Sequence, residues 1–559
     1  LPPPPSPLSA QRRSPLDEGP APLDARALLV DPLDQFLKQL HDKTEVARGV
    51  LNHLLHQSFP DAEPDAEPES DLMLDPDPDD ATVRAVLGRY PFRDVPKAYQ
   101  NLLGLARESV PFLSDRRCRH FLASIAPRLL KAVAETPDPD EALTRLERVS
   151  ASLGAKAVLW ELFSANPATL RLYVDLCAGS PFLSGILVNN PGMADELLDS
   201  LVLNQPRTAD DLRAELAELC RGASDPDPIL HSFQDKELLR IGVADLLGMA
   251  DIRTTTAALS DLADTVVNQI ADLVERDLAS KFDCCAAGCP PYCLLGLGKL
   301  GGREISYHSD LDLVLVFDPV AGDACGYFTE LAQRLIRAAS THGPMGRLYE
   351  VDMRLRPTGK SGSLVVPLEG FRKYYAEGSA QLWERQSLSR ARVVFGDPEF
   401  AERVKASLQR QVYEVEWKPT FADEIKAMRS RVEAAGSKRD LKRGTGGIVD
   451  IEFLTQMFRI KHGLKHPKVR EPNTWLALDA LHAEGLISAD EHGTLRACYD
   501  FMRTVEGRLR IFHNRSLDEL PARLLHLLDN GALVARPHHP RQVAVDGVVG
   551  NAGHRPAVL

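Results

Sequence analysis

The stretch LLGLGKLGGREISYHSDLDLVLVF, residues 294–317, joins two apolar runs through a glycine-rich turn and two aspartates. The first run ends at Leu295 and the second extends over residues 311–317, so both predict buried strands. Because alternate residues of a strand share a face, Asp310 and Asp312 should project to the same side. Two neighbouring carboxylates repel each other unless a cation neutralises them, and Mg²⁺ binds one or two carboxylates together with phosphate oxygens. This stretch therefore predicts a magnesium-dependent nucleotidyl-transfer site.

A third carboxylate lies in YEVDMRLRP, residues 349–357, where apolar and charged side chains alternate. The alternation predicts a strand that carries Asp352, Arg354 and Arg356 on one face. Three carboxylates can hold two metal ions, which clamp the attacking and leaving oxygens during displacement at phosphorus. We therefore expect Asp310, Asp312 and Asp352 to be both the catalytic residues and the metal ligands.

The glycine-rich turn brings backbone close to this predicted site. Glycine allows N–H groups to approach anionic oxygens, and cationic side chains can neutralise a triphosphate. The expected nucleotide-binding residues are Gly298, Lys299, Gly301, Gly302, Ser309, Arg354 and Arg356, with support from Lys360.

Each element taken alone also has a purely structural interpretation. The turn is not the phosphate-loop consensus, since no Ser or Thr follows Lys299. An Asp-x-Asp pair is common at solvated strand ends, and Asp352 between arginines is typical of a surface ion pair. The occurrence of all three elements in order on strands favours the catalytic interpretation.

Four stretches together resemble the bacterial glutamine-synthetase adenylyltransferases, which attach AMP to a tyrosine of glutamine synthetase. The resemblance covers roughly residues 85–520 and is weaker over residues 162–198. The stretches are GLGKLGGREISYHSDLDLVLVFD (296–318), YEVDMRLRPTGKSG (349–362), LWERQSLSRARVVFGD (382–397) and GTGGIVDIEFLTQ (444–456).

The resemblance implies an enzyme that moves AMP from MgATP to a tyrosine hydroxyl of glutamine synthetase and releases pyrophosphate. It also implies control by the PII signalling protein and by glutamine. Members of the family usually carry two nucleotidyltransferase domains, one of which removes AMP, and only one set of motifs occurs here. Tyr307 and the Val449-Asp450 pair are similar to the adenylylating version. The alternatives are phosphorolytic AMP removal and a non-catalytic truncated helical adaptor that binds glutamine synthetase or PII.

The charge distribution separates an acidic segment from a nearly neutral remainder. The formal net charge is −13, but residues 61–80 hold ten acids and no base, so the rest of the chain carries only −3. A nearly neutral body argues against a nucleic-acid polymerase, which needs a broad basic groove. Neither a run of 18 apolar residues nor a signal-peptide pattern occurs, which predicts a cytoplasmic protein without membrane contact.

The expected fold is α+β and predominantly helical, with a small mixed sheet in a nucleotidyltransferase domain similar to that of DNA polymerase β. The charged residues 401–443 predict one long helix. Its Arg431, Lys442 and Arg443 could reach phosphates, but the pattern favours a solvated basic face. After a break at 444–447 a second helix should begin, on which Asp450 and Glu452 do not share a face and support the site. The expected divisions are a Pro-rich start with a remnant helix (1–60), an acidic disordered linker (61–82), a helical region (83–245), the nucleotidyltransferase domain (246–400), a C-terminal helical bundle (401–525) and an irregular tail (526–559). The start at Leu1 and the irregular tail suggest a fragment or a truncated reading.

Overall fold

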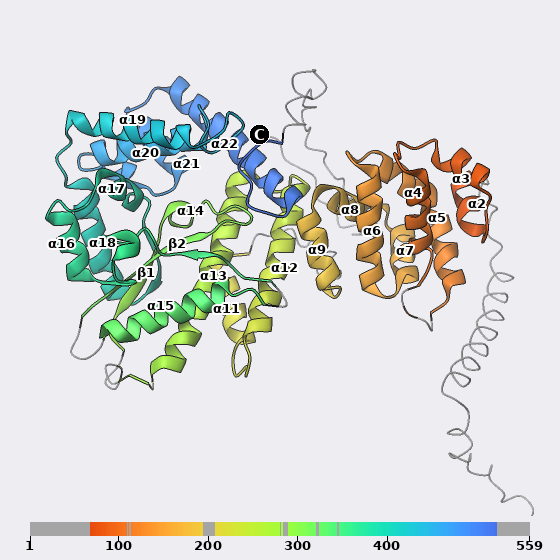
Figure 1. Cartoon of the computed structure of the whole chain (residues 1–559), viewed down its shortest axis with the longest axis horizontal. Coiled ribbons are helices and arrows are strands. Elements are labelled where there is room, and N and C mark those ends of the chain that lie inside the picture. Colours follow the sequence, from red (N-terminus) through yellow and green to blue (C-terminus); the bar gives the residue numbers. More distant parts are fainter. Residues whose placement is uncertain are drawn as a thin grey trace, which may run out of the picture.

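The computed structural model describes residues 67–521, apart from 109, 111–112, 194–206, 280, 283–284, 286–288, 320–323 and 344–345. The Pro-rich start with its remnant helix and the irregular tail that the sequence predicts lie outside the described residues. Helices predominate, and a small mixed sheet lies near the middle of the chain (Figure 1). The α+β, mostly helical class is therefore confirmed.

The sheet has five strands in the order β3-β2-β1-β5, and β4 also pairs with β2. β2 is antiparallel to β1, while β3 and β4 run parallel to it and share one of its edges. The two apolar runs of the decisive stretch form β1 and β2, as predicted. The strands are β1 (Tyr292–Gly296), β2 (Leu311–Phe317), β3 (Val351–Asp352), β4 (Val365–Pro367) and β5 (Arg392–Gly396).

Alternate residues of the central strands enter two different cores. Leu313 and Leu315 face the core shared with α11, α12, α13 and α15, whereas Val314 and Val316 face the core shared with α16 and α18. The period of two along β2 thus lets one strand bury both of its faces. The helices of this part are α11 (Ala209–Leu219), α12 (Asp227–Leu246), α13 (Ile252–Ala279), α14 (Gly298–Gly301), α15 (Ala324–Ser340), η2 (Gly359–Ser361), α16 (Leu368–Ala376), α17 (Leu382–Leu388) and α18 (Pro398–Tyr413).

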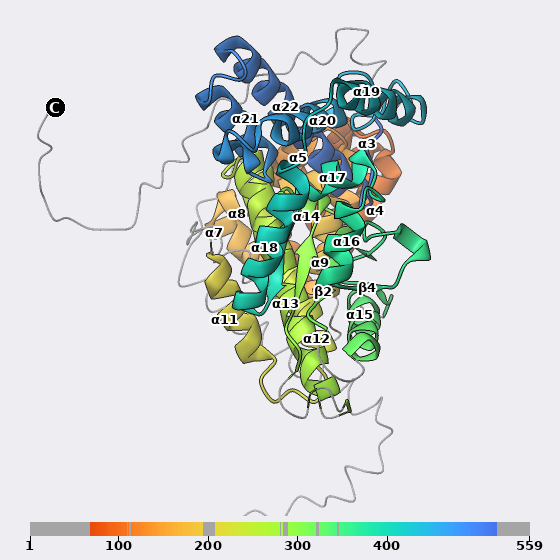
Figure 2. The same ribbon diagram turned by 90° about the vertical axis from the view of Figure 1, so that its left-hand side faces the viewer.

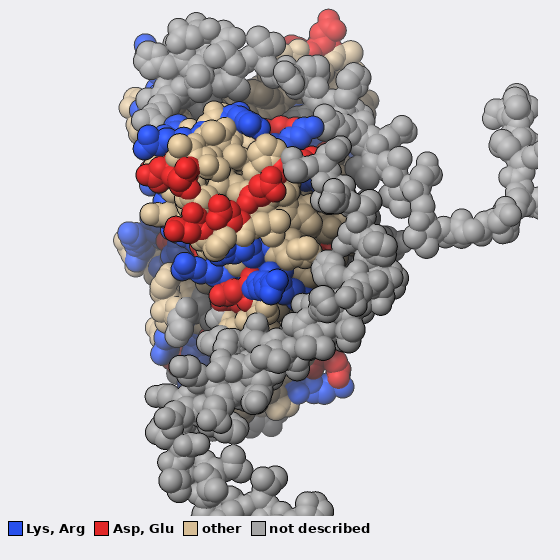
Figure 3. All heavy atoms as spheres, turned by 90° about the vertical axis from the view of Figure 1, so that its right-hand side faces the viewer, with Lys and Arg blue, Asp and Glu red and all other residues tan. Residues whose placement is uncertain are grey.

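A separate helical region lies at the far end of the molecule, beyond α12 (Figure 1). Viewed from that end, the described residues show acidic and basic side chains interspersed (Figure 3). Because α12 contributes Leu239 to this core and Phe233 to the core of the sheet, the two parts meet within one helix. The helices are α2 (Pro68–Leu74), α3 (Asp80–Leu87), α4 (Val95–Leu105), α5 (Asp115–Ala134), α6 (Pro139–Leu153), α7 (Lys156–Ala165), α8 (Pro167–Gly179) and α9 (Pro181–Asn189).

The expectation of a disordered linker over residues 61–82 is wrong for the part that the structure describes. Helix α2 forms inside it, and its Leu72 and Met73 are buried in the N-terminal core. Ser70 Oγ donates to the carbonyl oxygen of Ala123 on α5 at 2.9 Å. Acids in the first turn and a proline at the helix start both favour helix formation, so a segment that looks self-repelling is ordered once α5 covers its apolar face.

The C-terminal helices gather at one end of the sheet (Figure 2). The single long helix expected over residues 401–443 is wrong, because α18 ends at Tyr413 and the next helix starts at Pro419 and ends at Ala434. Proline lacks the backbone donor that a helix interior needs but fits the first turn. The predicted restart after residue 447 is confirmed. The helices are α19 (Pro419–Ala434), α20 (Ile448–His462), η3 (Pro467–Arg470), α21 (Thr474–Ala483) and α22 (Ala489–His513).

Within the described residues, no single helix is long and apolar enough to span a membrane. The pair α8 and α9 would reach that length and composition together, but the two helices meet at a bend of 113°.

Candidate active site

The three predicted carboxylates meet where β2 begins. Asp312 and Asp352 are directly paired in the parallel ladder of β2 and β3. Leu311 N donates to the Glu350 carbonyl oxygen at 2.8 Å, and this hydrogen bond joins the start of β2 to the residue before β3. Asp310 is exposed just before β2, while Asp312 and Asp352 are half-buried. Residues separated by 40 positions in the sequence are thus brought to one edge of the sheet.

The electrostatics of Asp312 reflect this crowding. Burial raises its pKa to about 6, and the charges of Asp310 and Asp352 act in the same direction. Lys442 and Arg354 offset only part of the shift. Like-charged groups that stay this close keep a carboxylate poorly ionised unless a cation joins them.

Asp352 carries its own counter-ion. Arg354 Nε lies 2.9 Å from Oδ1 and 2.6 Å from Oδ2 of Asp352, and the Arg354 backbone N–H donates to Oδ1 at 2.8 Å. Burial would raise the pKa of Asp352, but Arg354, with a contribution from the exposed Lys360, lowers it below its ordinary value. The third carboxylate is therefore already neutralised.

The donor set suits a hard divalent cation, because Mg²⁺ prefers carboxylate oxygens and no Lys or Arg among the described residues forms an ion pair with Asp312. Among the described residues, however, no three Asp, Glu, His or Cys side chains already surround one point as metal ligands do. The Asp352 carboxylate is instead engaged by Arg354. Asp310 and Asp312 are the residues that would hold the cation first.

The strand predicted over residues 349–357 stops early, which changes the position of Arg356. β3 ends at Asp352, and a turn follows in which Arg356 Nε donates to the Ser363 carbonyl oxygen at 2.8 Å and Nη1 to that of Met353 at 2.6 Å. Thr358 in this turn has a positive φ of 60°. Arg356 is thus engaged by the turn and does not share a face with Asp352, contrary to expectation.

The glycine-rich turn forms the short helix α14, and its glycines have different roles. Gly298 has a φ of +53°, and a Cβ there would lie 2.4 Å from Oδ2 of Asp312. A Cβ on Gly301 would lie 1.9 Å from the Arg390 carbonyl oxygen, and one on Gly302 would lie 2.4 Å from Nη2 of Arg390. Gly298 therefore leaves room beside the carboxylates, while Gly301 and Gly302 permit close packing on Arg390.

Two predicted nucleotide-binding side chains are engaged by helix α22. Lys299 Nζ lies 2.5 Å from Glu506 Oε1, and burial lowers the pKa of Lys299 to about 7 although Glu506 favours its charged form. Ser309 Oγ accepts hydrogen bonds from Arg510 Nη1 at 3.1 Å and from the Ser306 backbone at 3.2 Å. Neither side chain points freely toward a ligand in this structure.

Asp450 and Glu452 lie on α20 and have different partners, as the helical spacing predicts. Asp450 accepts from Arg429 Nε at 2.5 Å and from the Gly446 backbone at 2.6 Å, so it holds the start of α20. Glu452 lies 2.9 Å from Arg390 Nη1. Burial would raise the pKa of Glu452, but Arg390 and other cations lower it.

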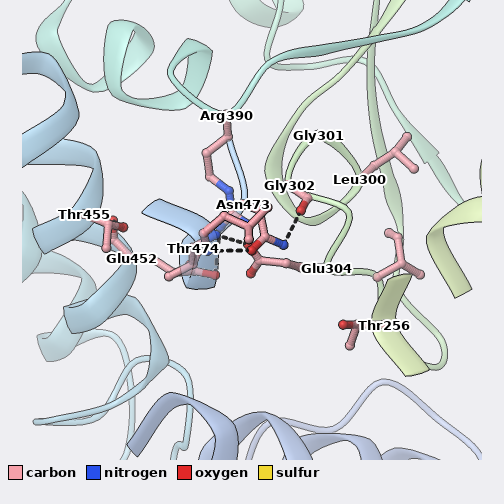
Figure 4. A network of polar contacts seen from close by, with 12 residues as sticks. Thr256, Leu300, Gly301, Gly302, Glu304, Arg390, Glu452, Thr455, Asn473 and Thr474 are labelled. Atoms are coloured by element: carbon pink, nitrogen blue, oxygen red, sulfur yellow. Dashed lines mark hydrogen bonds and ion pairs between the residues drawn. The ribbon is translucent and has the colours of Figure 1, made fainter. Parts of the chain in front are cut away.

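Sequence reasoning missed a buried network of charged and polar side chains (Figure 4). Arg390 bridges Glu452 and Glu304, with Nη2 2.9 Å from Glu304 Oε1, and all three side chains are buried. Glu304 Oε1 also accepts from the Thr474 backbone at 2.6 Å, and Glu304 Oε2 accepts from Tyr499. No local sequence pattern indicates this network, because the residue type of a charged side chain does not reveal whether the side chain is buried or exposed. It fixes the bundle against the glycine turn.

Comparison with known proteins places this geometry in a family. Residues 170–407 match the family model described as glutamate-ammonia ligase adenylyltransferase, and residues 420–534 match that of the PII-uridylyltransferase GlnD. A protein of Thioalkalivibrio sulfidiphilus is 32% identical over 456 residues, covering 77% of this chain and 47% of the relative. One from Chromobacterium violaceum is 31% identical over 484 residues, covering 85% and 53%.

Both relatives are named bifunctional glutamine synthetase adenylyltransferase/adenylyl-removing enzyme, and the chain spans about half of their length. The sheet, its three carboxylates and the glycine turn all fall within residues 170–407. The chain belongs to the glutamine synthetase adenylyltransferase family.

Proposed function

We propose that this chain transfers AMP from MgATP to a tyrosine hydroxyl of glutamine synthetase, in the cytoplasm, and releases pyrophosphate. The observation that carries the proposal is the pairing of Asp312 with Asp352 beside Asp310, at an edge where a glycine leaves room for a ligand. A half-buried carboxylate with a raised pKa and no paired cation is a candidate functional group. The family relationship supports glutamine synthetase as the protein substrate.

The reaction is an in-line displacement at the α-phosphorus. The tyrosine oxygen forms a bond to this phosphorus, the bond from phosphorus to the bridging oxygen breaks, pyrophosphate departs and the tyrosine proton passes to solvent. A divalent cation at Asp310 and Asp312 would stabilise the charge that develops on the reacting phosphate. Gly298 keeps the space beside Asp312 open, and Arg354 holds Asp352 until a competing cation arrives.

The adenylylating direction is favoured over removal of AMP. The relatives are named for both activities, and the described residues contain one set of sheet, glycine turn and carboxylates. Tyr307, which resembles the adenylylating version, is buried and donates to Asp245 Oδ2 at 3.0 Å. The PII protein and glutamine are the proposed regulators, on the strength of the family relationship alone.

The test incubates the full chain with glutamine synthetase, Mg²⁺ and ATP labelled at either the α- or the γ-phosphate. We expect label from the α-phosphate on the synthetase and none from the γ-phosphate, and we expect no labelling when the target tyrosine is replaced by phenylalanine. Label from the γ-phosphate would indicate a kinase and contradict the proposal. In a parallel reaction with AMP-modified synthetase and phosphate, any release of ADP should be much slower than AMP transfer in the forward reaction. Release of ADP at a rate comparable with AMP transfer would instead support the AMP-removing activity.

A further inference from the structure

The loop between α19 and α20 is held by hydrogen bonds at Lys442 and at the residue before it. Leu441 N donates to the Asp518 carbonyl oxygen at 2.8 Å, and Val449 N donates to the Lys442 carbonyl oxygen at 3.0 Å. Asp440 Oδ1 accepts from the Lys442 backbone at 3.0 Å. Two of these hydrogen bonds hold the Lys442 backbone itself and one holds the residue before it, so the Lys442 side chain starts from a defined position.

A series of side-chain contacts connects this loop to the carboxylate edge. Asp518 Oδ1 lies 2.6 Å from Arg510 Nη2, and the other terminal nitrogen of Arg510 donates to Ser309 Oγ, next to Asp310. Arg510 Nη2 also lies 3.0 Å from Glu506, the partner of Lys299 in the glycine turn. The loop is thus anchored, through α22, to both sides of the predicted nucleotide site.

The cations of this region differ in how they are neutralised. Lys299 is paired with Glu506, Arg510 with Glu506 and Asp518, and Arg443 with Asp440 at 2.7 Å. Within residues 67–521 as described, the Lys442 ammonium makes no hydrogen bond and no ion pair with a side chain. Its charge nevertheless acts on Asp312, Glu452 and Lys299. Lys442 is a half-buried cation beside the site that protein acids leave without a direct partner.

We propose that Lys442 binds the departing pyrophosphate portion of ATP, as a cation that the C-terminal bundle supplies to the site on the sheet. The proposal rests on the proposed function, and it replaces the sequence-based assignment of Lys442 to a solvated basic face. Negative charge accumulates on the oxygen that bridges the α- and β-phosphorus atoms as its bond to the α-phosphorus breaks. An ammonium held near this oxygen stabilises that charge.

The assignment also explains why two structural parts meet at the site. Asp310 and Asp312 would hold the metal beside the α-phosphate from the sheet, and Lys442 would bind the β- and γ-phosphates from the loop before α20. Binding of ATP would therefore join the bundle to the sheet through its phosphates. A ligand that lacks these phosphates would not need Lys442.

The experiment measures the affinity of the full chain for ATP and for AMP, in the presence of Mg²⁺, by isothermal titration calorimetry. The variants are Lys442→Gln and Lys442→Arg, and the matched control is Lys438→Gln, an exposed lysine of the same loop. We expect Lys442→Gln to weaken ATP binding at least tenfold and AMP binding less than twofold. Lys442→Arg should retain most of the ATP affinity because it keeps the charge, and Lys438→Gln should bind both ligands as the wild type does.

Three results would overturn the inference. Unchanged ATP binding by Lys442→Gln would show that Lys442 makes no contact with the nucleotide. An equal loss for ATP and AMP would place Lys442 at the adenosine or the α-phosphate instead of the pyrophosphate. In both cases wild-type ATP binding leaves the proposed function intact, whereas failure of the wild type itself to bind ATP would remove the proposed function and this inference together.

Discussion

Two groups of charged residues lie close together in this molecule and are organised in opposite ways. At the sheet edge, Asp310, Asp312 and Asp352 gather like charges, and the pKa of Asp312 rises. In the network behind it, Glu304 and Glu452 share Arg390, and the pKa of Glu452 falls. The network is neutralised by the protein itself, which fits a structural role. The edge is left incomplete, and we interpret this as the place of a cation and a nucleotide.

The largest expected effect concerns the edge. Asp310→Asn or Asp312→Asn should lower the rate of AMP transfer by several orders of magnitude while the circular dichroism spectrum stays the same. Loss of a metal ligand removes several kcal/mol of transition-state stabilisation. The measurement is the rate of label transfer from α-labelled ATP. Retention of more than about a tenth of the rate, which corresponds to only ~1.4 kcal/mol, would remove that aspartate from the site.

The next effect concerns the network. Arg390→Met should destabilise the protein by about 3–5 kcal/mol, because it leaves two buried carboxylates without their counter-ion. Urea denaturation, followed by fluorescence, measures the loss. The control is Arg303→Met, which breaks a half-exposed pair with Asp261 and should cost no more than about 1 kcal/mol. Equal losses in the two variants would contradict the distinction drawn between buried and exposed pairs.

A smaller effect has the opposite sign. Without divalent cations, Asp312→Asn should stabilise the protein at pH 7 by roughly 1–3 kcal/mol, since a raised pKa makes the ionised form costly and each pH unit corresponds to ~1.4 kcal/mol. The folded wild type binds more protons than the unfolded chain between the ordinary pKa of 3.8 and about 6, so its stability falls as the pH rises through that window.

The difference in stability between the variant and the wild type should therefore reach its full size above pH 6 and disappear below pH 3.8. Thermal denaturation across this range measures it. Addition of Mg²⁺ should stabilise only the wild type, because ligand binding to the folded state adds stability. A variant that is less stable than the wild type at pH 7 without cations would show that Asp312 is already well neutralised.

Local sequence patterns were sufficient to predict those elements whose burial can be read from neighbouring residues. The apolar runs predicted β1 and β2, and the spacing of Asp310 and Asp312 placed them at the edge of a strand. Lys299 was different, because its partner Glu506 lies 207 residues away and no pattern connects them. The same holds for Leu72, whose burial depends on a helix that starts at Asp115.

Two further differences have local causes that the patterns did not reveal. Alternation over residues 349–357 predicted a strand, but the turn after Asp352 uses Arg356 to satisfy its own carbonyl groups. The glycines of the turn were assigned to the nucleotide together, whereas Gly301 is required by a backbone carbonyl from Arg390, which follows 89 positions later. Periodicity predicts on which face of a helix or strand a residue lies, but it does not identify the groups that contact the side chain.

The central claim is that the carboxylate edge is incomplete because a divalent cation belongs there. Electron paramagnetic resonance of Mn²⁺, in the presence of a non-hydrolysable ATP analogue, tests it directly. The wild type should bind Mn²⁺, and Asp312→Asn should bind it at least about a hundredfold more weakly, or ~2.7 kcal/mol. Asp450→Asn, which changes a carboxylate paired with Arg429, should bind Mn²⁺ as the wild type does. Equal Mn²⁺ affinity in the wild type and in a folded Asp312→Asn variant would contradict the account.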